Sequence, residues 1–373
     1  MIGLTRRGWI LVFTIGLAGL PALRGQSYKV QAPIIERNLT VFPVAADRIF
    51  DTGTLLTLDE GTRSGDVEVV EAGQARGLVR PRRPEPPPIW PERPLPLPPS
   101  PESPSLSAEV NVIVIVNRSA RPLLVLAGEI VVGGKQDRVI AKDRLLPAHS
   151  GPVRVEVFCV EPHRWTSTRA GFDSLADAIA QPSVRTKAMA SGDQQEVWNQ
   201  VAKSRAAFLA ATPPAEADVI AGTSSYAAAI QSASVRRQLD SLAGPMGQSY
   251  EGFLKELRAR QAVGVVVAVD QELIWADVFA SPGLLQQYWP KLIRSYAAEA
   301  ITPRIRPAVV KFPVTEAQAQ AFLDKFEGRK ETVETEPGVY RYTEIAGDDF
   351  DAFILAGLLP NLNFNVHAAK MKR

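Results

Sequence analysis

Twelve of the thirty prolines in this 373-residue chain fall between residues 81 and 104. The stretch reads PRRPEPPPIWPERPLPLPPSPESP. Proline lacks an amide donor and fixes φ, so this stretch cannot form a helix or an inner strand of a sheet. We expect a solvated, extended polyproline II segment there.

Two interpretations of this proline-rich segment compete, because strand-like sequence lies on both sides of it, at Val67–Glu71 and 108–116. A linker would leave only residues 26–80 in front of it, which is small for a domain. We therefore predict one large domain over residues 26–373, with residues 81–104 as a surface insertion. Proline-rich segments also bind other proteins, so residues 81–104 are where we expect a protein partner to bind.

The N-terminus has the features of a cleavable signal peptide. Arg6 and Arg7 precede an apolar run at residues 9–20, which is too short to span a bilayer comfortably. Small and helix-breaking residues then lead to Gly25.

We expect residues 1–25 to be a leader that is removed near Gly25, and the mature protein to lie outside the cytoplasm, in the periplasm or secreted. The alternative is an N-terminal anchor that is retained. The segment Thr5–Ile10 also fits the start of a twin-arginine signal, so the sequence leaves the export route open.

Composition excludes some classes of partner. The chain has 42 basic and 40 acidic residues, a net charge of +2, so no basic excess points to nucleic acid or to a membrane surface beyond the leader. The single cysteine, Cys159, excludes an internal disulfide. The three histidines do not combine with it in a metal-ligand spacing, so no metal site is expected, and no cofactor is identified.

The two halves of the chain differ in their periodicity. From Asn38 to Cys159, short β-branched runs alternate with turns, which predicts antiparallel strands. The expected strands are at residues 39–44, 67–71, 110–116, 123–127, 129–132, 138–141 and 153–160.

After Trp165 the spacing becomes helical, with a helix capped at Ser191 or Asp193 and another capped at Ser281. The other expected elements are helices at residues 226–243, 249–261 and 316–326, a β-pair at 264–269 and 273–279, and strands within 331–366. The prediction is an α+β fold, in which an antiparallel β-rich N-terminal half packs on a mixed α/β C-terminal half.

The segment 127–165 carries the first candidate site, a Gly133-Gly134-Lys135 turn after an expected strand. Glycines allow a positive φ, and consecutive amide groups in such a turn form an anion-binding nest. Lys135 and Arg138 would add positive charge for a phosphate or a carboxylate. The spacing is not that of a Walker loop, and the simpler alternative is a hairpin turn with Lys135 in water.

Glu129 and Glu161 are the candidate acid and base. Each interrupts or ends an apolar strand, where a carboxylate is costly unless it is paired. If the strands are neighbours, the two carboxylates would converge with Arg138 or Arg164 in a site for general acid/base work. The alternative is that both glutamates form structural salt bridges.

Two further acidic residues, Glu196 and Asp277, are candidates. Glu196, in Gln195-Glu196-Val197-Trp198, lies on an expected helix and on a different face from the core, so it is a third candidate. Asp277 interrupts an apolar strand as Glu129 does, so it is either paired or functional. Lys291 and Tyr296 fit an amphipathic helix as a surface and a core residue respectively.

Four motifs together resemble a bacterial domain family of unknown function. They are GEIVVGGKQDRV, CVEPHRW, QQEVW and DVFASPGLLQQYWPKLIRSYAAEA. The family is the ARG and rhodanese-phosphatase-superfamily-associated protein domain, where ARG stands for ADP-ribosylglycohydrolase. The resemblance runs from about Asn38 to the C-terminus, on both sides of the proline-rich segment, which favours an insertion.

The resemblance implies a set of shared positions, not a reaction. Those that we take as ligand-binding are Gly133, Gly134, Lys135, Gln136, Arg138, Arg164 and Trp165; those that we take as catalytic are Glu129, Glu161 and Glu196; the remaining shared positions are Cys159, Trp198, Asp277, Lys291 and Tyr296. The first hypothesis is a domain that binds or processes an anionic small molecule, such as a nucleotide or an ADP-ribose-like group. The second is a non-catalytic extracytoplasmic interaction module in which the same residues form a structural network.

Overall fold

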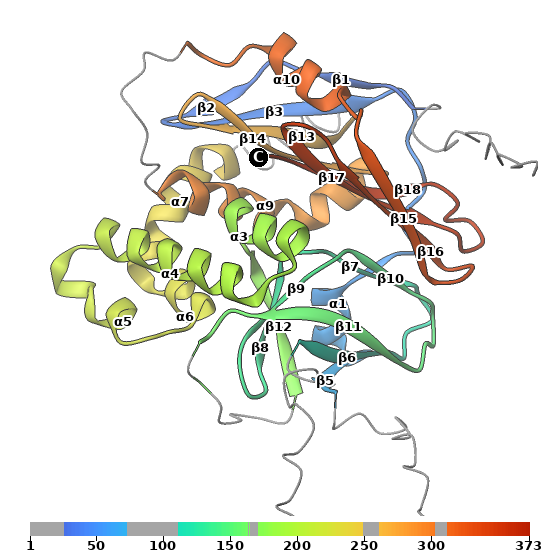
Figure 1. Cartoon of the computed structure of the whole chain (residues 1–373), viewed down its shortest axis with the longest axis horizontal. Coiled ribbons are helices and arrows are strands. Elements are labelled where there is room, and N and C mark those ends of the chain that lie inside the picture. The colour runs from blue at the N-terminus through green and yellow to red at the C-terminus, as the bar shows by residue number, and fades with distance from the viewer. Residues whose placement is uncertain (1–25, 73–110, 163, 165–170, 249–260, 303–311) are drawn as a thin grey trace, which may run out of the picture.

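The computed structural model of the chain describes residues 26–72, 111–162, 164, 171–248, 261–302 and 312–373. Within them, a large antiparallel sheet, a closed barrel and a group of helices form an α+β fold (Figure 1). The predicted class and the β-rich N-terminal half are confirmed.

The large sheet combines strands from both ends of the chain. Its strands are β1 (Tyr28–Val30), β2 (Ile34–Glu36), β3 (Leu39–Ala46), β13 (Ala262–Val269), β14 (Glu272–Phe279), β15 (Arg329–Glu336), β16 (Tyr340–Ala346), β17 (Phe350–Gly357) and β18 (Asn365–Lys372). Their order is β1-β3-β13-β14-β18-β17-β16-β15, and β2 pairs with β3. Because β3 lies beside β13, the first strands belong to the sheet of the C-terminal half (Figure 1).

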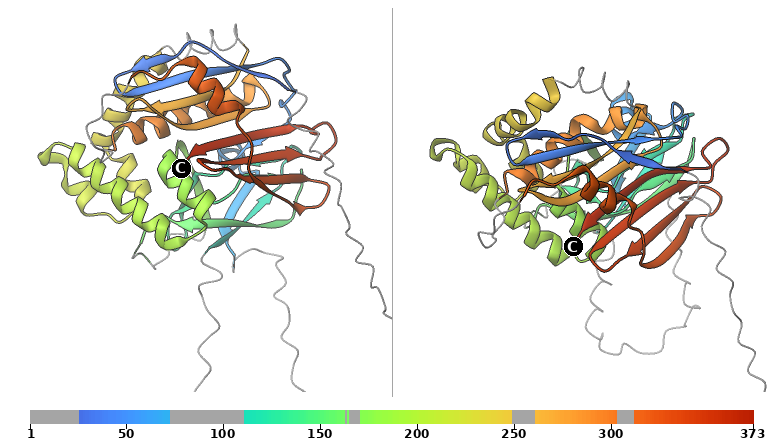
Figure 2. Two further views of the ribbon diagram at one scale, coloured as in Figure 1. Left: turned by 45° about the horizontal axis from the view of Figure 1, so that its top comes forward. Right: turned by 90° about the horizontal axis from the view of Figure 1, so that it is seen from above.

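Both faces of this sheet are covered. Successive side chains of a strand point to opposite faces, so Val41 and Phe42 enter different clusters. The Val41 face packs against α9 (Pro282–Ala300), which also contacts the barrel and lies between the two (Figures 1 and 2). The Phe42 face is covered by α10 (Glu316–Asp324).

Helix α9 begins where the sequence predicts. The Ser281 hydroxyl accepts a hydrogen bond from the amide of Leu284 at 3.1 Å, which satisfies one of the free amides of the first turn. Trp289 and Tyr296 are fully buried, and so are most positions around the helix. The exposed positions form only a narrow stripe through Gln287 and Pro290, and Lys291 lies outside it.

The closed barrel follows the order β11-β6-β5-β12-β8-β9. Its strands are β5 (Val67–Glu71), β6 (Val112–Asn117), β8 (Glu129–Gly133), β9 (Arg138–Ile140), β11 (Pro152–Cys159) and β12 (Gly171–Ile179). Alternating side chains such as Val69, Ile115 and Val157 fill its interior. β5 pairs directly with β6; the predicted insertion between them lies outside the described residues and stays a prediction.

A small sheet and a short helix adjoin the barrel. β7 (Leu123–Val125) pairs with β10 (Arg144–Leu146) and, in parallel, with β4 (Leu56–Thr57). Helix α1 (Leu58–Ser64) follows β4, and Thr57 and Glu60 form a capping box at its start. The helix carries Asp59 in its first turn.

The remaining helices form one side of the molecule (Figure 1). They are α3 (Pro182–Thr186), a π-helical turn (Lys187–Ser191), α4 (Gln194–Ala211), a 3₁₀ turn (Pro214–Glu216), α5 (Asp218–Ala221), α6 (Tyr226–Gln231) and α7 (Ala233–Gln248). Asp193 caps α4, as one of the two predicted caps.

One predicted helix is divided. Residues 226–243 were expected to form a single helix, but Ser232 is extended and separates α6 from α7. Its carbonyl accepts the amide of Arg236 and so starts the second helix, a position that serine favours over a helix interior. The helix predicted at residues 249–261 lies almost wholly outside the described residues.

Candidate functional site

The Gly133-Gly134-Lys135 turn connects β8 to β9 at one end of the barrel. Gly133 has φ of 130° and Gly134 has φ of 48°, both in the region that favours glycine. A Cβ on Gly134 would lie 2.3 Å from Cζ of Phe172 and 2.6 Å from Oε1 of Glu71. Gly134 is therefore required for two reasons: Phe172 and Glu71 pack where a Cβ would lie, and its φ is positive.

The backbone donors of this turn already have partners within the chain. The amide of Lys135 donates to Oε1 of Glu71 at 2.8 Å, and the amide of Gly134 donates to the carbonyl oxygen of Gly171 at 3.2 Å. The carboxylate of Glu71 thus occupies the place in which an external anion was expected. The side chain of Lys135 is exposed.

Beside the turn lies a cluster of Asp137, Glu161 and Arg164, which we call the turn cluster. Nη2 of Arg164 is 2.6 Å from Oε2 of Glu161 and 3.2 Å from Oδ1 of Asp137. Its Nη1 donates to the carbonyl oxygen of Gly134 at 3.1 Å. The hydrogen bond that Arg164 donates to Glu161 raises the pKa of Arg164, whereas burial raises the pKa of Asp137. Arg164 therefore ties the segment after β11 to the turn.

Arg138 and Gln136 lie buried next to the turn cluster. Nη1 of Arg138 donates to Oε1 of Gln136 at 3.2 Å, and Gln136 donates to the carbonyl oxygen of Glu161 at 3.1 Å. Nη2 of Arg138 is 4.0 Å from Oε1 of Glu71. Its buried Nε has no hydrogen-bond partner among the described residues, and burial lowers the pKa of this guanidinium.

Cys159 lies opposite Arg138 in the barrel and is fully buried. Burial raises the pKa of its thiol, so the reactive thiolate is disfavoured. This environment is that of an inert core cysteine.

Glu129 belongs to a different group of charges. Its Oε1 is 2.6 Å from Nζ of Lys291, and its Oε2 accepts the amide of Leu126 at 2.8 Å. Lys291 also pairs with Asp59 at 2.5 Å. Burial raises the pKa of Glu129, although the positive charge of Lys291 acts in the opposite direction. Burial also disfavours the charged form of Lys291, but the carboxylates of Glu129 and Asp59 outweigh it and raise the pKa of Lys291.

The expected convergence of Glu129 and Glu161 is not seen: within the described part of the chain they share no hydrogen-bond or ion-pair partner. The prediction of Lys291 as a surface residue was wrong, because α9 is enclosed between the sheet and the barrel and Lys291 is only 2% exposed. Asp59 was missed, although its place in the first turn after a capping box was visible in the sequence.

The most deeply buried charges form what we call the interlayer network. Arg185 of α3 holds Asp277 of β14 through two hydrogen bonds of 2.8 and 3.0 Å. The Tyr296 hydroxyl donates to Asp277 at 2.5 Å. His367 of β18 lies between carboxylates, with Nδ1 2.6 Å from Asp143 and Nε2 3.2 Å from Asp277.

Both ring nitrogens of His367 face carboxylates, so both donate and the ring is an imidazolium. Burial disfavours this charge, but Asp143 and Asp277 raise the pKa of His367 to about 9. Burial also works against the charge of Asp277, yet Arg185 and His367 hold the pKa of its carboxyl well below the usual range. The sequence identified Asp277 as paired or functional but did not predict His367 or Asp143.

Two site candidates remain. Glu196 is exposed on α4 and pairs with Lys187 at 2.6 Å. Trp165 lies outside the described residues.

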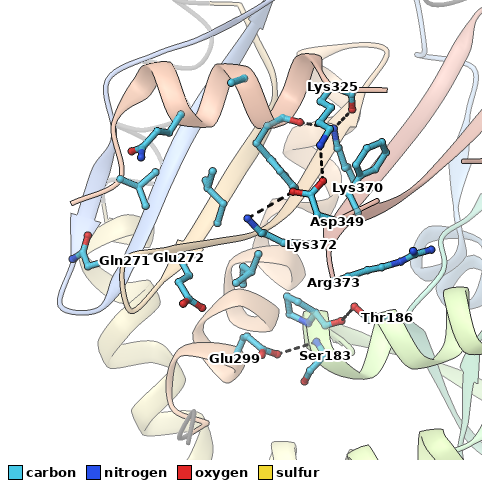
Figure 3. Close-up of a pocket in the computed structure, with 18 of the residues that line it drawn as sticks. Ser183, Thr186, Gln271, Glu272, Glu299, Lys325, Asp349, Lys370, Lys372 and Arg373 are labelled. Atoms are coloured by element: carbon cyan, nitrogen blue, oxygen red, sulfur yellow. Dashed lines mark hydrogen bonds and ion pairs between the residues drawn. The ribbon is translucent and has the colours of Figure 1, made fainter. Parts of the chain in front are cut away.

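An open pocket of about 690 Å³ lies elsewhere, between α3, the β13–β14 hairpin, α10 and the last two strands (Figure 3). We call it the basic pocket. Its cationic lining residues are Lys187, Lys325, Lys370, Lys372 and Arg373, and its anionic lining residues are Glu272, Glu299 and Asp349. None of the site candidates that the structure describes lines it.

The described residues contain no group of three or more histidine, cysteine, aspartate or glutamate side chains placed to hold a metal ion. Nor does the described part of the chain include a helix that is both long and apolar enough to cross a membrane.

Residues 27–368 match the family model described as the ARG and Rhodanese-Phosphatase-superfamily-associated Protein domain. No curated protein and no solved structure matches the chain.

Proposed function

The chain belongs to the ARG and Rhodanese-Phosphatase-superfamily-associated Protein domain family, and we propose that it is a binding module whose buried carboxylates stabilise the fold. In this proposal Glu129 and Glu161 do not act as acid and base. The observation that carries it is that each of them is within 2.6 Å of a cationic side chain of the same chain.

The geometry of these pairs supports a structural role. A general acid or base must reach a proton on the substrate, and so needs a face open to a cleft. Glu129 is fully buried and held by Lys291 and by a backbone amide. Glu161 binds the amide of Asp137 as well as Arg164, and neither glutamate lines the basic pocket.

A screen for turnover tests this proposal. The purified protein would be incubated with nucleotides, ADP-ribose and sugar phosphates, and Glu161→Gln would be compared by turnover and by thermal denaturation. We expect no turnover, and a lower Tm for Glu161→Gln because the Arg164 charge loses its closest partner. Turnover that disappears in Glu161→Gln at an unchanged Tm would overturn the proposal and restore the catalytic hypothesis.

A second candidate function is anion binding at the Gly133-Gly134-Lys135 turn. It is favoured by the exposed side chain of Lys135 and by the unsatisfied Nε of Arg138 close by. A ligand there would have to displace Glu71 from the turn. Lys135→Ala would then weaken binding of a nucleotide, and unchanged affinity would exclude the turn as the site.

We also propose that the protein is exported and that residues 1–25 are removed. The support is the pattern of paired arginines, short apolar run and small residues at the N-terminus. N-terminal sequencing of protein from the periplasm or the medium should begin near Gln26. An intact N-terminus in the membrane fraction would instead support the retained anchor.

The proline-rich segment at residues 81–104 is proposed to be a surface insertion that is available to a protein partner. Direct pairing of β5 with β6 supports this, because the barrel is closed without the segment. Deleting residues 81–104 should therefore leave the Tm unchanged. A protein that no longer folds after the deletion would contradict the insertion.

A further inference from the structure

We infer that the basic pocket binds a small organic anion, a molecule with a phosphate or carboxylate head and an apolar body, and that Lys370 and Lys372 face the head. This inference rests on the proposed function, because it names the ligand class of a binding module. It moves the site away from the segment 127–165, where the sequence placed it.

The size and lining of the pocket fit such a ligand. Small-molecule sites occupy roughly 300–1,000 Å³, and this pocket has about 690 Å³. Leu273, Val314, Phe322 and Phe350 give it apolar walls, and amide and hydroxyl side chains complete the lining. Figure 3 shows Lys372 and Lys325 pointing to Asp349 on one wall, with Ser183 and Glu299 on another.

Two of the three carboxylates of the pocket, Asp349 and Glu299, are bound by groups of the protein. Asp349 is 2.8 Å from Nζ of Lys325. Glu299 accepts the backbone amide of Ser183 at 2.9 Å and the amide group of Gln181 at 3.2 Å. Lys187 and Arg373 pair with Glu196 and Asp351, which do not line the pocket. Lys370 and Lys372 are therefore the cations that a ligand anion would meet.

Lys370 is the buried cation of this pocket. Only 2% of the residue is exposed, and its ammonium donates to the carbonyl oxygens of Phe322 and Lys325 at the end of α10. The rings of Phe350, Phe326 and Phe322 lie 4.0, 4.6 and 4.9 Å from Nζ. No carboxylate of the described residues lies within salt-bridge distance of Lys370. This distinguishes Lys370 from the other buried lysine of the described residues, Lys291.

An ammonium has three donors, and the two carbonyl oxygens use two of them. Burial lowers the pKa of Lys370 to about 8, with Lys325 acting in the same direction and Asp349, Glu327 and Asp324 opposing it. A bound anion would stabilise the charged form. Affinity should therefore fall as pH rises through about 8.

Lys372 provides a movable partner at the mouth of the pocket. Its side chain is 49% exposed, and its Nζ is 3.9 Å from Oδ2 of Asp349. An exposed ion pair at this distance contributes little to stability. Lys372 can therefore turn to an incoming anion at little cost, and its substitution should leave the fold intact.

Isothermal titration calorimetry tests the inference with four probes: adenosine monophosphate, benzoate, inorganic phosphate and uncharged adenosine. We expect saturable binding of adenosine monophosphate or benzoate and none of adenosine. Whichever of the two anions binds identifies the head as a phosphate or a carboxylate, and inorganic phosphate alone should bind more weakly because it lacks the apolar body.

Lys372→Ala is the decisive variant, and Lys203→Ala on α4 is its matched control. Both remove one exposed lysine charge, but only Lys372 lines the pocket. Lys372→Ala should weaken binding by roughly tenfold, since a hydrogen bond to a charged group is lost. Lys203→Ala should leave the affinity unchanged.

Three results would overturn the inference: no saturable binding of either anion at millimolar concentration, equal affinities in Lys372→Ala and the wild type, or binding that only Lys135→Ala removes. None of these outcomes would disturb the proposed structural role of Glu161, which fails only if turnover depends on that residue. The two proposals can therefore fail separately.

Discussion

The interlayer network and the turn cluster contain the same kinds of side chain in different surroundings. In the interlayer network, the side chains of Arg185, Asp277 and His367 are 0% exposed. In the turn cluster, Arg164 is 19% exposed and Glu161 is 12% exposed. Water at the barrel end can replace a lost partner in the turn cluster, whereas no solvent reaches the interlayer network.

The two groups also differ in what they connect. The interlayer network joins α3, β14, β18, α9 and the loop before β10, so it holds the large sheet to the layers beneath it. The turn cluster joins one turn of the barrel to the segment after β11 and, through Ser225, to the start of α6. Damage to the first should spread further than damage to the second.

The largest effect is expected from Asp277→Asn. The substitution keeps the shape of the side chain but leaves Arg185 and His367 buried without their shared carboxylate. Breaking a buried pair in this way costs roughly 3–5 kcal/mol of unfolding free energy. Urea denaturation would measure it, with Asp240→Asn, in an exposed pair with Arg294, as the control that should change little. Equal losses in the two variants would show that burial does not set the cost of losing a carboxylate in this protein.

His367 makes the interlayer network sensitive to pH. Its pKa in the folded protein, about 9, is above the ordinary value of 6.5. A raised pKa means that the folded state holds the proton more tightly, so the stabilisation is complete below pH 6.5 and is lost as pH rises through about 9. Chemical denaturation across this range should show the decline.

His367→Gln is the control for this pH dependence. The variant should be less stable at neutral pH and should lack the His367 part of the decline. Lys370 titrates in an overlapping range, but its pKa is lowered, so its contribution to stability rises with pH instead of falling. The quantity to compare is therefore the difference in unfolding free energy between wild type and variant at each pH. An identical pH profile in both proteins would show that the His367 charge does not stabilise the network.

Gly134→Ala tests the turn. At this position a Cβ meets Phe172 and Glu71 and the backbone φ is positive, so we expect a loss of roughly 1–3 kcal/mol. Gly65→Ala is the matched control, because Gly65 also has a positive φ but nothing lies within 4 Å of its added Cβ. A similar loss at both glycines would mean that strain alone, and not contact with Glu71, shapes the turn.

Glu196→Gln should have the smallest effect. Glu196 and Lys187 are 47% and 40% exposed, and an exposed ion pair contributes at most about 1 kcal/mol. Thermal denaturation should find the variant close to the wild type. A loss comparable to that of Asp277→Asn would show that an exposed ion pair of this protein stabilises the fold as much as a buried one.

Strong local signals predicted most of the elements. Alternating or continuous β-branched runs located β3, β13 and β14, and a serine cap followed by apolar residues at helical spacing located α9. β12 was not predicted, because its sequence GFDSLADAI mixes small and polar residues without alternation. It is a strand because β5 and β8 pair with it on both edges.

The candidate site was less predictable than the fold. The sequence grouped Glu161, Arg164 and Arg138 near the glycine turn, and they do lie there. It also placed Glu129 with them, although Glu129 points to Lys291 from an enclosed helix. The basic pocket was not foreseen, because its lining comes from elements far apart in the chain.

By itself the sequence determined where most strands and helices begin, that no internal disulfide forms, and that Glu129 and Asp277 need partners within their apolar strands. Only the tertiary structure decided which partners those are. Glu129 and Lys291 are 162 residues apart, and Asp277 and Arg185 are 92 apart. Capping and alternation act over a few residues and can be read locally, whereas an ion pair depends on which distant segments are packed together and on how completely they exclude water.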